Sequence, residues 1–261
     1  MSEVVLEAGD AVAVLDTTGG RLSQLTVHGH DLLVPFTDRW SLSGCYPMVP
    51  WAGRLDRGRF SFGGVDHQLP ITMEPHAIHG VAMEVDWDLV GDGRMQVELA
   101  QGWPLGGVAE TTYALTDSSI TCTVSVTATD QALPAAIGFH PCFTRSLAGN
   151  ADDLSFAPEF MWERGEDYLP TGAQIRPAPD GPWDDCFGGV TGAPTLTWGD
   201  ALAVELRSPT DTWVTFDQLD AAICVEPPTD TPNAFNMSGG AALEPGESLA
   251  LTLEIVWKYP S

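Results

Sequence analysis

Residues 119–127 read SITCTVSVT and residues 248–257 read SLALTLEIVW, and in both stretches apolar side chains stand at every second position. Successive side chains of a β-strand point to opposite faces of its sheet, so this period of two predicts strands with one buried face. The side chains that would be buried are Ile120, Cys122, Val124 and Val126 in the first stretch and Leu249, Leu251, Leu253, Ile255 and Trp257 in the second. Both stretches therefore predict half-buried antiparallel strands.

The same alternation recurs in shorter runs along the chain. These runs are VVLEA (4–8), AVAVLD (11–16), GRFSFGGV (58–65), MQVELA (95–100), ALAVELR (201–207) and TWVTFD (212–217). The 27 glycines and 20 prolines interrupt the chain often, and no long stretch repeats with the period of a helix. Many short strands separated by turn residues are typical of a β-sandwich or barrel. We expect an all-β fold, a large antiparallel β-sandwich with few short helices, and a parallel α/β sheet is disfavoured.

The length of 261 residues suits one domain, because β-sandwiches and barrels often reach about 250 residues as a single unit. We therefore expect a single domain over residues 1–261. The most loop-like stretch is residues 158–195, which is dense in Gly, Pro, Asp and Trp. A loop that long inside a compact domain is usually functional.

The chain is strongly acidic, with 36 Asp and Glu against 11 Lys and Arg and a formal net charge of -25. Such a surface repels phosphate groups, so we expect neither a nucleic acid nor an anionic membrane as a partner. Lys258 is the only lysine in the sequence. Schiff-base chemistry and a phosphate-binding P-loop are therefore disfavoured.

The N-terminal residues MSEVVLEAGD have no basic segment followed by an apolar one, and no apolar run reaches the roughly 18 residues of a membrane span. We expect a cytoplasmic protein. The five cysteines are an odd number and contain no C-x-x-C pair, which fits neither a disulfide framework nor a zinc ribbon. We interpret them as reduced thiols that are mostly buried.

Three ionisable residues adjoin apolar segments, a position at the rim of a core where pKa values are shifted. Glu226 ends the apolar run AAICV (221–225) and precedes two prolines, which cannot continue a central strand. A carboxylate is thus expected at the end of a buried strand. His140 follows AAIGF, and His79 lies in HAIHGVAMEVDW just before a strand-like segment. Each of the three could instead be structural, bonded to a carbonyl or to loop amides.

Two histidines and a carboxylate can also bind iron or zinc, but the sequence has no H-E-x-x-H motif. His28 and His30 form an H-x-H in a turn-like setting, where solvated side chains are expected. His76 and His79 are three residues apart and would need a third donor from elsewhere. We therefore predict no metal site.

Nucleophilic catalysis has little support, because the sequence has no G-x-S-x-G motif. Cys142 is the only cysteine near a histidine, two residues after His140, and residues two apart on a strand share a face. Contact between the two is conceivable, but we interpret Cys142 as a small buried thiol. The glycine pair in FGGVDHQL indicates a hairpin, because no G-x-G-x-x-G links a strand to a helix.

Arginines are scarce, yet three lie in WAGRLDRGRF. Arg57 and Arg59 flank a turn glycine and are expected on the surface. Arg54 follows Trp51 by three residues, and a desolvated guanidinium there needs acceptors that a polyol ligand would supply. Sugar rings stack on aromatic side chains, so we expect Trp51 to contact the ligand, although most of the nine tryptophans are expected in the core.

Several segments in order resemble those of the aldose 1-epimerase (galactose mutarotase) family over most of the chain. PWAGRLDRGRFSFGGVDHQL resembles its Pro-Trp-x-Asn-Arg-Ile segment and hairpin, AIHGVAMEVDW its His-Gly segment, and GFHPCF its Gly-x-His-Pro-Tyr-Phe segment. DDCF resembles its Asp-x-x-Phe, and CVEPPTDTPNAFN followed by LEPGES resembles its carboxylate segment and strand lead-in. No single motif is specific to the family, but the shared order of all these segments makes the resemblance strong.

The resemblance implies an antiparallel supersandwich that interconverts the α and β anomers of free aldohexoses, such as glucose or galactose, without a cofactor. It implies Glu226 as the general base, His140 as the general acid and His79 as a second histidine at the sugar. It also implies that Arg54 and Asp184 bind sugar hydroxyls. The expected partner is thus a small-molecule sugar, bound by a monomer or a homodimer.

Asp184 is preferred to Asp185 because the family aspartate precedes its phenylalanine, here Phe187, by three positions. The chain departs from the family pattern at Gly53, where the family has Asn, and at Cys142, where it often has Tyr. These departures affect the expected substrate range more than the expected chemistry.

Three alternatives stay open at this point. A hexose-6-phosphate 1-epimerase would share the fold and the acid–base pair but needs cations for the phosphate, which Arg57 or Arg59 could supply. A non-catalytic sugar-binding or sugar-sensing module would not require both His140 and Glu226. A metal-dependent β-barrel enzyme is the third.

Overall fold

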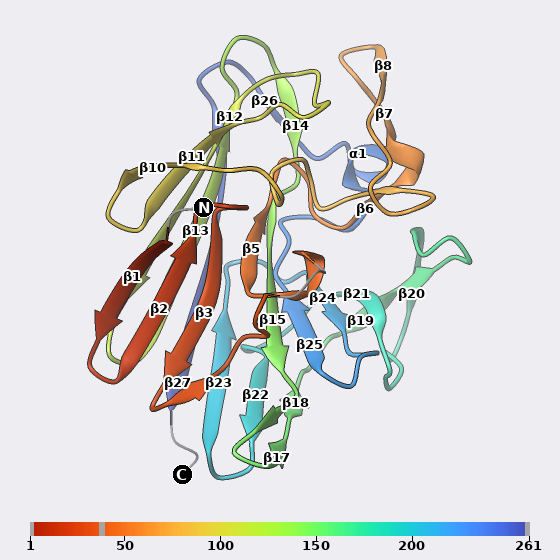
Figure 1. Cartoon of the computed structure of the whole chain (residues 1–261). Coiled ribbons are helices and arrows are strands. Elements are labelled where there is room, and N and C mark those ends of the chain that lie inside the picture. The colour runs from red at the N-terminus through yellow and green to blue at the C-terminus, as the bar shows by residue number, and fades with distance from the viewer. Residues whose placement is uncertain (1–2, 37–39, 259–261) are drawn as a thin grey trace.

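Two large antiparallel sheets dominate the computed structural model, which describes residues 3–36 and 40–258 (Figure 1). In spatial order the first sheet consists of β1 (Glu3–Ala8), β2 (Ala11–Asp16), β3 (Arg21–Val27), β5 (Cys45–Met48), β15 (Gly138–Thr144), β25 (Ala222–Glu226), β24 (Trp213–Phe216), β21 (Asp184–Gly188), β19 (Phe160–Arg164) and β20 (Pro170–Ile175), with β4 (His30–Asp31) paired to β3. The second consists of β10 (Asp88–Gly91), β11 (Arg94–Glu98), β12 (Val108–Leu115), β13 (Ser119–Thr127), β27 (Ser248–Lys258), β23 (Leu202–Arg207), β22 (Thr195–Trp198) and β18 (Asp153–Ser155). The all-β prediction is confirmed.

Small elements connect the sheets. The two-stranded pairs are β6 (Arg54–Leu55) with β9 (Ala77–Ile78), β7 (Arg59–Phe62) with β8 (Val65–Gln68), β14 (Leu133–Ala135) with β26 (Ala241–Leu243), and β16 (Ser146–Leu147) with β17 (Asn150–Ala151). The helical elements of the described residues are α1 (Ala234–Met237) and the 3-10 turns η1 (Trp40–Leu42) and η2 (Asp56–Gly58). Helices are therefore few and short, as expected, and the predicted hairpin at the glycine pair is the β7–β8 turn.

The core lies between the two sheets. Strand β13 pairs with β27 so that Val124 faces Leu251 and Cys122 faces Leu253, and all four side chains are buried. The inward side chains of β2, such as Leu15, belong to the same hydrophobic cluster. The period of two that the sequence displays is thus the alternation between this core and the outer surface.

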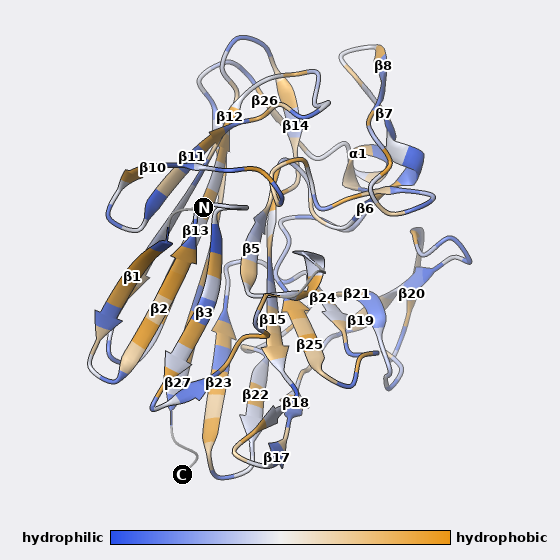
Figure 2. Ribbon diagram, in the orientation of Figure 1, coloured by the Kyte–Doolittle hydropathy of each residue, from blue (hydrophilic) through white to orange (hydrophobic). Residues whose placement is uncertain are grey.

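The central strands of the first sheet position the site. Every residue of β25 is buried, and so is every residue of β15 except the last, Thr144. Strands covered on both faces lose the alternating pattern and become nearly continuous apolar runs. Figure 2 shows β25 and much of β15 in hydrophobic colours. A polar side chain on either strand therefore stands in a largely dehydrated setting.

The interpretation of residues 158–195 as a long loop is wrong. The segment contains β19, β20, β21 and the start of β22. The first three strands extend the first sheet to its far edge, and β22 pairs with β18 at the edge of the second sheet. Most of β20 is exposed, because it is an edge strand, so its sequence lacks the apolar alternation of a half-buried strand. The glycines and prolines that suggested a loop lie mainly between these strands or at their ends.

No helix in the described ranges, 3–36 and 40–258, is long and apolar enough to span a membrane.

Candidate active site

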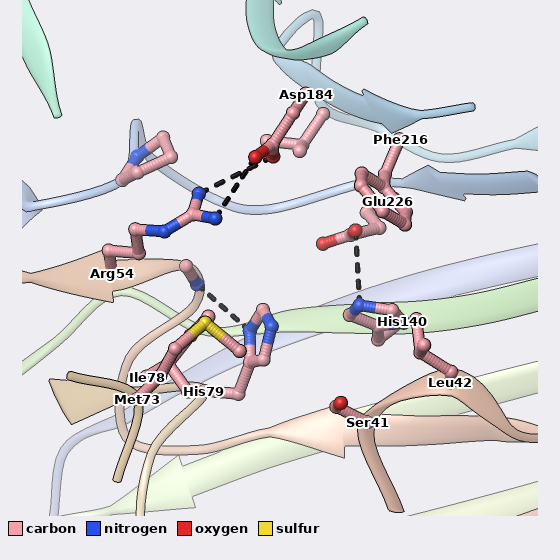
Figure 3. Close-up of a pocket in the computed structure, with 13 residues that line it drawn as sticks. Ser41, Leu42, Arg54, Met73, Ile78, His79, His140, Asp184, Phe216 and Glu226 are labelled. Carbon is pink, nitrogen blue, oxygen red and sulfur yellow. Dashed lines mark hydrogen bonds and ion pairs between the residues drawn. The ribbon is translucent and has the colours of Figure 1, made fainter. Parts of the chain in front are cut away.

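His140 and Glu226 face each other across two neighbouring strands. Strands β15 and β25 pair with Cys142 opposite Cys224, and two residues farther along this register His140 comes opposite Glu226. The Nε2 atom of His140 lies 3.2 Å from the Oε1 atom of Glu226, and both residues are buried (Figure 3). Glu226 is the last residue of β25, so its carboxylate stands at the end of a buried strand, as the following prolines predicted.

The environment of this pair favours a protonated histidine beside an ionised carboxylate. Burial alone lowers the pKa of His140, but the negative charges of Glu226 and Cys142 outweigh it and raise the pKa to about 9. Burial raises the pKa of Glu226 to about 7, against the opposing effect of His140. Between these two values the pair holds an acid and a base side by side.

His79 stands next to His140, with the two rings edge to face and their centroids 4.8 Å apart. Burial, and then the positive charges of His140 and Arg54, hold the pKa of His79 well below its usual value, so this ring is neutral. Its Nδ1 atom accepts a hydrogen bond from the backbone N–H of Gly53 at 3.3 Å. The proton of a neutral ring is then on Nε2, which makes His79 a hydrogen-bond donor at its other nitrogen.

Arg54 and Asp184 form the opposite wall. The guanidinium of Arg54, on β6, makes two hydrogen bonds to the carboxylate of Asp184, of 3.0 and 3.4 Å. Arg54, Asp184, His79, His140 and Glu226 all line one pocket, with Phe216 from β24 as an aromatic side chain (Figure 3). The pocket therefore combines an acid–base pair with fixed donors and acceptors, a set that can bind and ionise a small polyol.

Asp184 rather than Asp185 faces this pocket. Asp185 is buried beside Arg164, whose Nε atom lies 3.3 Å from Oδ1 of Asp185. Both aspartates lie on β21, and neighbouring residues of a strand point to opposite faces.

Residues 2–181 match the family described as Aldose 1-epimerase. The chain belongs to the aldose 1-epimerase family. The matched segment includes Arg54, His79 and His140, whereas Asp184 and Glu226 lie beyond its end.

Two relatives of this family member are uncharacterized proteins of Escherichia coli K12. YphB is 27% identical over 246 residues, which cover 82% of this chain and 84% of YphB. YihR is 29% identical over 168 residues, 59% of this chain, and the match spans only 53% of YihR, about half its length.

Solved structures share the fold of this family member. A candidate aldose 1-epimerase from Escherichia coli K12 superposes with a TM-score of 0.87 at 21% identity, over 99% of each chain. A galactose mutarotase-like protein from Clostridium acetobutylicum has a TM-score of 0.83 at 17% identity and covers 98% of this chain and 95% of its own. An aldose epimerase homologue from C. elegans has a TM-score of 0.83 at 16% identity, over 100% and 99% of the two chains.

Two residues of the present chain that adjoin the site, Tyr46 and Arg21, were not predicted from the sequence. Tyr46, on β5, is opposite His140 in the sheet, and the two rings stack with centroids 4.8 Å apart. The guanidinium of Arg21, which is buried, lies 4.7 Å from the centroid of the Tyr46 ring. Neither residue has a local sequence signal, because Tyr46 contacts His140, and Arg21 contacts Tyr46, only through strands that are distant in the chain.

Trp51 does not line the pocket, contrary to the expectation that it contacts the ligand. Its indole is 3% exposed and packs in the core against Trp103 and Phe235, with ring centroids 6.0 and 6.3 Å away. Among the described residues, which include all nine tryptophans, the tryptophans do not line the pocket and Phe216 does. Trp51 was assigned by its closeness to Arg54 in sequence, but the turn between them directs the two side chains apart.

Gly53 is fixed by its neighbours. Its φ is +69°, and a Cβ atom there would come within 2.8 Å of Pro232. The asparagine of the family pattern would therefore require Pro232 to move.

The remaining cationic and histidine candidates lie elsewhere. Arg57 pairs with Asp56, and Arg59 donates a hydrogen bond to Gln68 on the β7–β8 hairpin. Neither arginine lines the pocket, as a phosphate-binding residue would have to. His76 is buried and structural: its Nδ1 accepts from the N–H of Arg57, and its Nε2 lies 2.8 Å from the carbonyl of Asp167.

Three donors come close enough to share a metal ion within the described part of the chain: His140, Cys142 and Cys224, whose nearest atoms lie within 4.8 Å of one another. The two sulfurs are 2.9 Å apart. Two thiolates on one tetrahedral zinc ion stand about 3.8 Å apart, given Zn–S bonds of about 2.3 Å. The cluster as arranged does not have the geometry of a zinc site, and the expected absence of a metal stays a prediction.

Proposed function

We propose that this protein is an aldose 1-epimerase, an isomerase that interconverts the α and β anomers of free aldohexoses such as glucose or galactose. The observation that carries the proposal is the buried pair of His140 and Glu226, 3.2 Å apart in the wall of a polar pocket. Anomerisation needs one group to take a proton from the C1 hydroxyl and another to give a proton to the ring oxygen. A protonated histidine beside a carboxylate supplies both.

Ring opening begins when Glu226 removes the proton from O1 and His140 donates one to O5. The C1–O5 bond breaks as the C1 carbonyl forms, so the sugar becomes the open-chain aldehyde. Rotation about the C1–C2 bond exposes the other face of the carbonyl. O5 then attacks this face while His140 takes back its proton and Glu226 returns one to O1, so both groups end as they began.

The other pocket residues orient the sugar. Arg54 is held by Asp184, so its guanidinium is fixed before the sugar arrives, and hydroxyl oxygens accept from its free N–H groups. Asp184 accepts from hydroxyls, and neutral His79 donates from Nε2. Phe216 offers an apolar surface to the C–H face of the ring.

The charge pattern favours an uncharged sugar. Among the described residues, Arg54 is the only lysine or arginine that lines the pocket, and its charge is already balanced by Asp184. A phosphate or sulfate group would meet Glu226 and Asp184 without a free cation. We further infer a cytoplasmic enzyme that works as a monomer or a homodimer and needs no cofactor.

The test is NMR exchange or polarimetry on freshly dissolved α-D-glucose and α-D-galactose, with and without protein and chelator. We expect faster approach to the same anomeric equilibrium, unaffected by chelator. No acceleration on either sugar would contradict the proposal for free aldohexoses, and acceleration on glucose 6-phosphate alone would favour the phosphorylated substrate. Binding of sugar without acceleration would indicate a sugar-binding module.

A further inference from the structure

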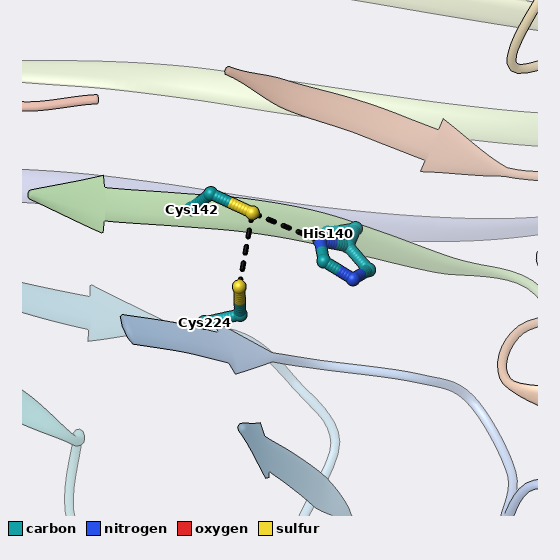
Figure 4. A group of neighbouring side chains, drawn as sticks. All are labelled: His140, Cys142 and Cys224. Carbon is teal, nitrogen blue, oxygen red and sulfur yellow. Dashed lines mark hydrogen bonds between the residues drawn. The ribbon is translucent and has the colours of Figure 1, made fainter. Parts of the chain in front are cut away.

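A pair of thiols lies directly behind the acid of the site. On the side of His140 away from Glu226, its Nδ1 atom is 3.3 Å from Sγ of Cys142, which is 2.9 Å from Sγ of Cys224 (Figure 4). All three side chains are buried, and both cysteines are free thiols. The proposed reaction uses neither sulfur.

The sheet holds these two cysteines in the arrangement that a disulfide needs. Cys142 donates its N–H to the carbonyl of Gly44 and accepts at its own carbonyl from Val34, so both backbone groups point away from β25. Cys142 and Cys224 are therefore a directly opposed pair without backbone hydrogen bonds between them. The Cα atoms of such pairs stand about 4.5 Å apart. Disulfides span Cα distances of about 4.4–6.8 Å, so the bond can form without moving the backbone.

The surroundings divide the two sulfurs into a nucleophile and a resolving thiol. Burial alone raises the pKa of Cys142, but the hydrogen bond from Cys224 and the charge of His140 lower it well below that of an ordinary thiol, with Arg21 adding to the effect. Burial raises the pKa of Cys224 well above the usual value. Cys142 is thus the sulfur that carries thiolate character, and Cys224 is the proton-bearing partner.

We propose that Cys142 and Cys224 are a redox pair of the site, which hydrogen peroxide converts into a disulfide. The Cys142 thiolate attacks one peroxide oxygen, the O–O bond breaks, and hydroxide leaves and takes a proton to become water. The sulfenic acid so formed on Cys142 is attacked by the sulfur of Cys224. The S–S bond forms, the S–O bond breaks and a second water leaves, so two thiols are oxidised and one peroxide is reduced to two waters.

Peroxide has a short route to this pair. Ser41 and His140 line the pocket, and the Sγ atom of Cys142 lies 3.8 Å from the carbonyl oxygen of Ser41. The sulfur is therefore one layer of atoms behind the pocket wall. An oxidant little larger than water needs only a small opening of this layer to reach the sulfur.

The disulfide changes the protonation of His140, the acid of the proposed reaction. A disulfide sulfur carries no negative charge and is a poor acceptor, so oxidation takes away the partner that Cys142 provides at Nδ1 of His140. The remaining titratable groups around this ring are Glu226, His79, Tyr46 and Cys45. With one anionic neighbour lost, less of His140 is protonated at a given pH, and a mutarotase slows. This consequence rests on the proposed function, whereas the disulfide itself does not.

The experiment treats the reduced full-length protein with graded hydrogen peroxide, quenches it by alkylation under denaturing conditions and maps the peptides without reduction. We expect loss of two hydrogens per chain and a Cys142–Cys224 linkage that dithiothreitol reverses. Cys186→Ala, which removes a buried cysteine outside the pair, should form the same linkage, and Cys224→Ala should not. Five alkylatable thiols after treatment, or a linkage between other cysteines, would overturn the proposal. The peptide map of the unmutated protein tests the proposal even if a variant fails to fold.

A second readout follows His140 itself. In imidazole ¹⁵N NMR, oxidation should lower the pH at which His140 loses its proton, and the mutarotation rate above neutral pH should fall and return with dithiothreitol. A disulfide that leaves both unchanged would overturn the link to the acid. A reversible disulfide in a protein whose reduced form has no mutarotase activity would refute the proposed function and leave the redox pair standing.

Discussion

His140 owes its proposed role to partners on both ring nitrogens. Nε2 meets Glu226 and Nδ1 meets Cys142, both within 3.3 Å, while Tyr46 stacks on the ring face. Partners on both edges fix the ring plane, and their negative charge keeps the ring protonated although it is buried. His79, a few ångströms away, has a cationic rather than an anionic neighbourhood and stays neutral. Two adjacent histidines are thereby set to opposite protonation states.

Removing either member of the acid–base pair should abolish most of the activity. Glu226→Gln cannot accept the O1 proton, and His140→Asn cannot protonate O5, so each should slow mutarotation by about 10²–10⁴-fold. Gln has the size of Glu, and Asn is a smaller polar replacement for His, so the strand signal in circular dichroism should be unchanged. Glu7→Gln, at an exposed position of β1, is the matched control and should keep the full rate. A near-full rate in either site variant would remove that residue from the mechanism.

The rate should depend on pH through the same pair. A folded-state pKa of about 7 for Glu226 means that the base becomes ionised as pH rises through 7. A pKa of about 9 for His140 means that the acid loses its proton as pH rises through 9. kcat/KM should therefore form a bell between these values, with the apparent pKa values belonging to the coupled pair. A rate that climbs steadily from pH 6 to 10 would argue against a protonated histidine as the acid.

The turn that follows β9 is constrained by a close contact between the backbones of Gly80 and Val49. Gly80 has φ +81°, and a Cβ atom on it would lie 1.8 Å from the carbonyl oxygen of Val49. His79, also at positive φ, precedes it and reaches the pocket from this turn. The glycine of the His-Gly motif is thus required by contact between two backbones, and the turn aims the histidine.

Gly80→Ala should destabilise the protein more than a glycine substitution at the same φ in open space. Gly29 provides that control, with φ +80° and no atom within 4 Å of its would-be Cβ. Alanine at positive φ costs about 1–3 kcal/mol at either site, and the clash with Val49 adds to this at Gly80. Urea unfolding of both variants measures the difference. Equal losses of unfolding free energy would mean that the backbone moves freely at Gly80.

The whole molecule carries a large excess of negative charge. The 36 acidic side chains outnumber the 11 basic ones, so repulsion remains after every basic side chain is paired. That repulsion acts mostly in the compact state, where charges lie close together. In the pocket the charge of Arg54 is balanced by Asp184, so an anionic sugar would find no free arginine or lysine among the described residues that line it.

Salt should therefore stabilise the fold. Raising NaCl from about 10 to 150 mM shortens the screening length from about 30 to 8 Å, so the melting temperature should rise by a few degrees. Differential scanning calorimetry at constant pH and protein concentration measures this. KCl at equal ionic strength should act like NaCl, because screening depends on charge alone. A melting temperature that stays constant or falls would show that surface ion pairs outweigh the net repulsion.

Much of the fold could be predicted because the burial of one face of a strand leaves alternating apolar residues in the sequence. Alternation in β13 and β27 indicated two half-buried strands, and Glu226 before two prolines indicated a carboxylate at a strand end. The single domain over the whole chain, the oligomeric state and the roles of the site residues stay predictions. The edge strand β20 was missed because an exposed strand has no apolar period.

The all-β class, the short strands and the residue types available for acid–base chemistry can be inferred from local sequence, since each depends on a segment and its own burial. Four contacts emerge only in the folded molecule: Trp51 packs in the core, Phe216 enters the pocket, Tyr46 stacks on His140, and Cys142 meets Cys224. These contacts join strands far apart in the chain. They are fixed by sheet register, and register is set by the packing of the whole core rather than by any local run of residues.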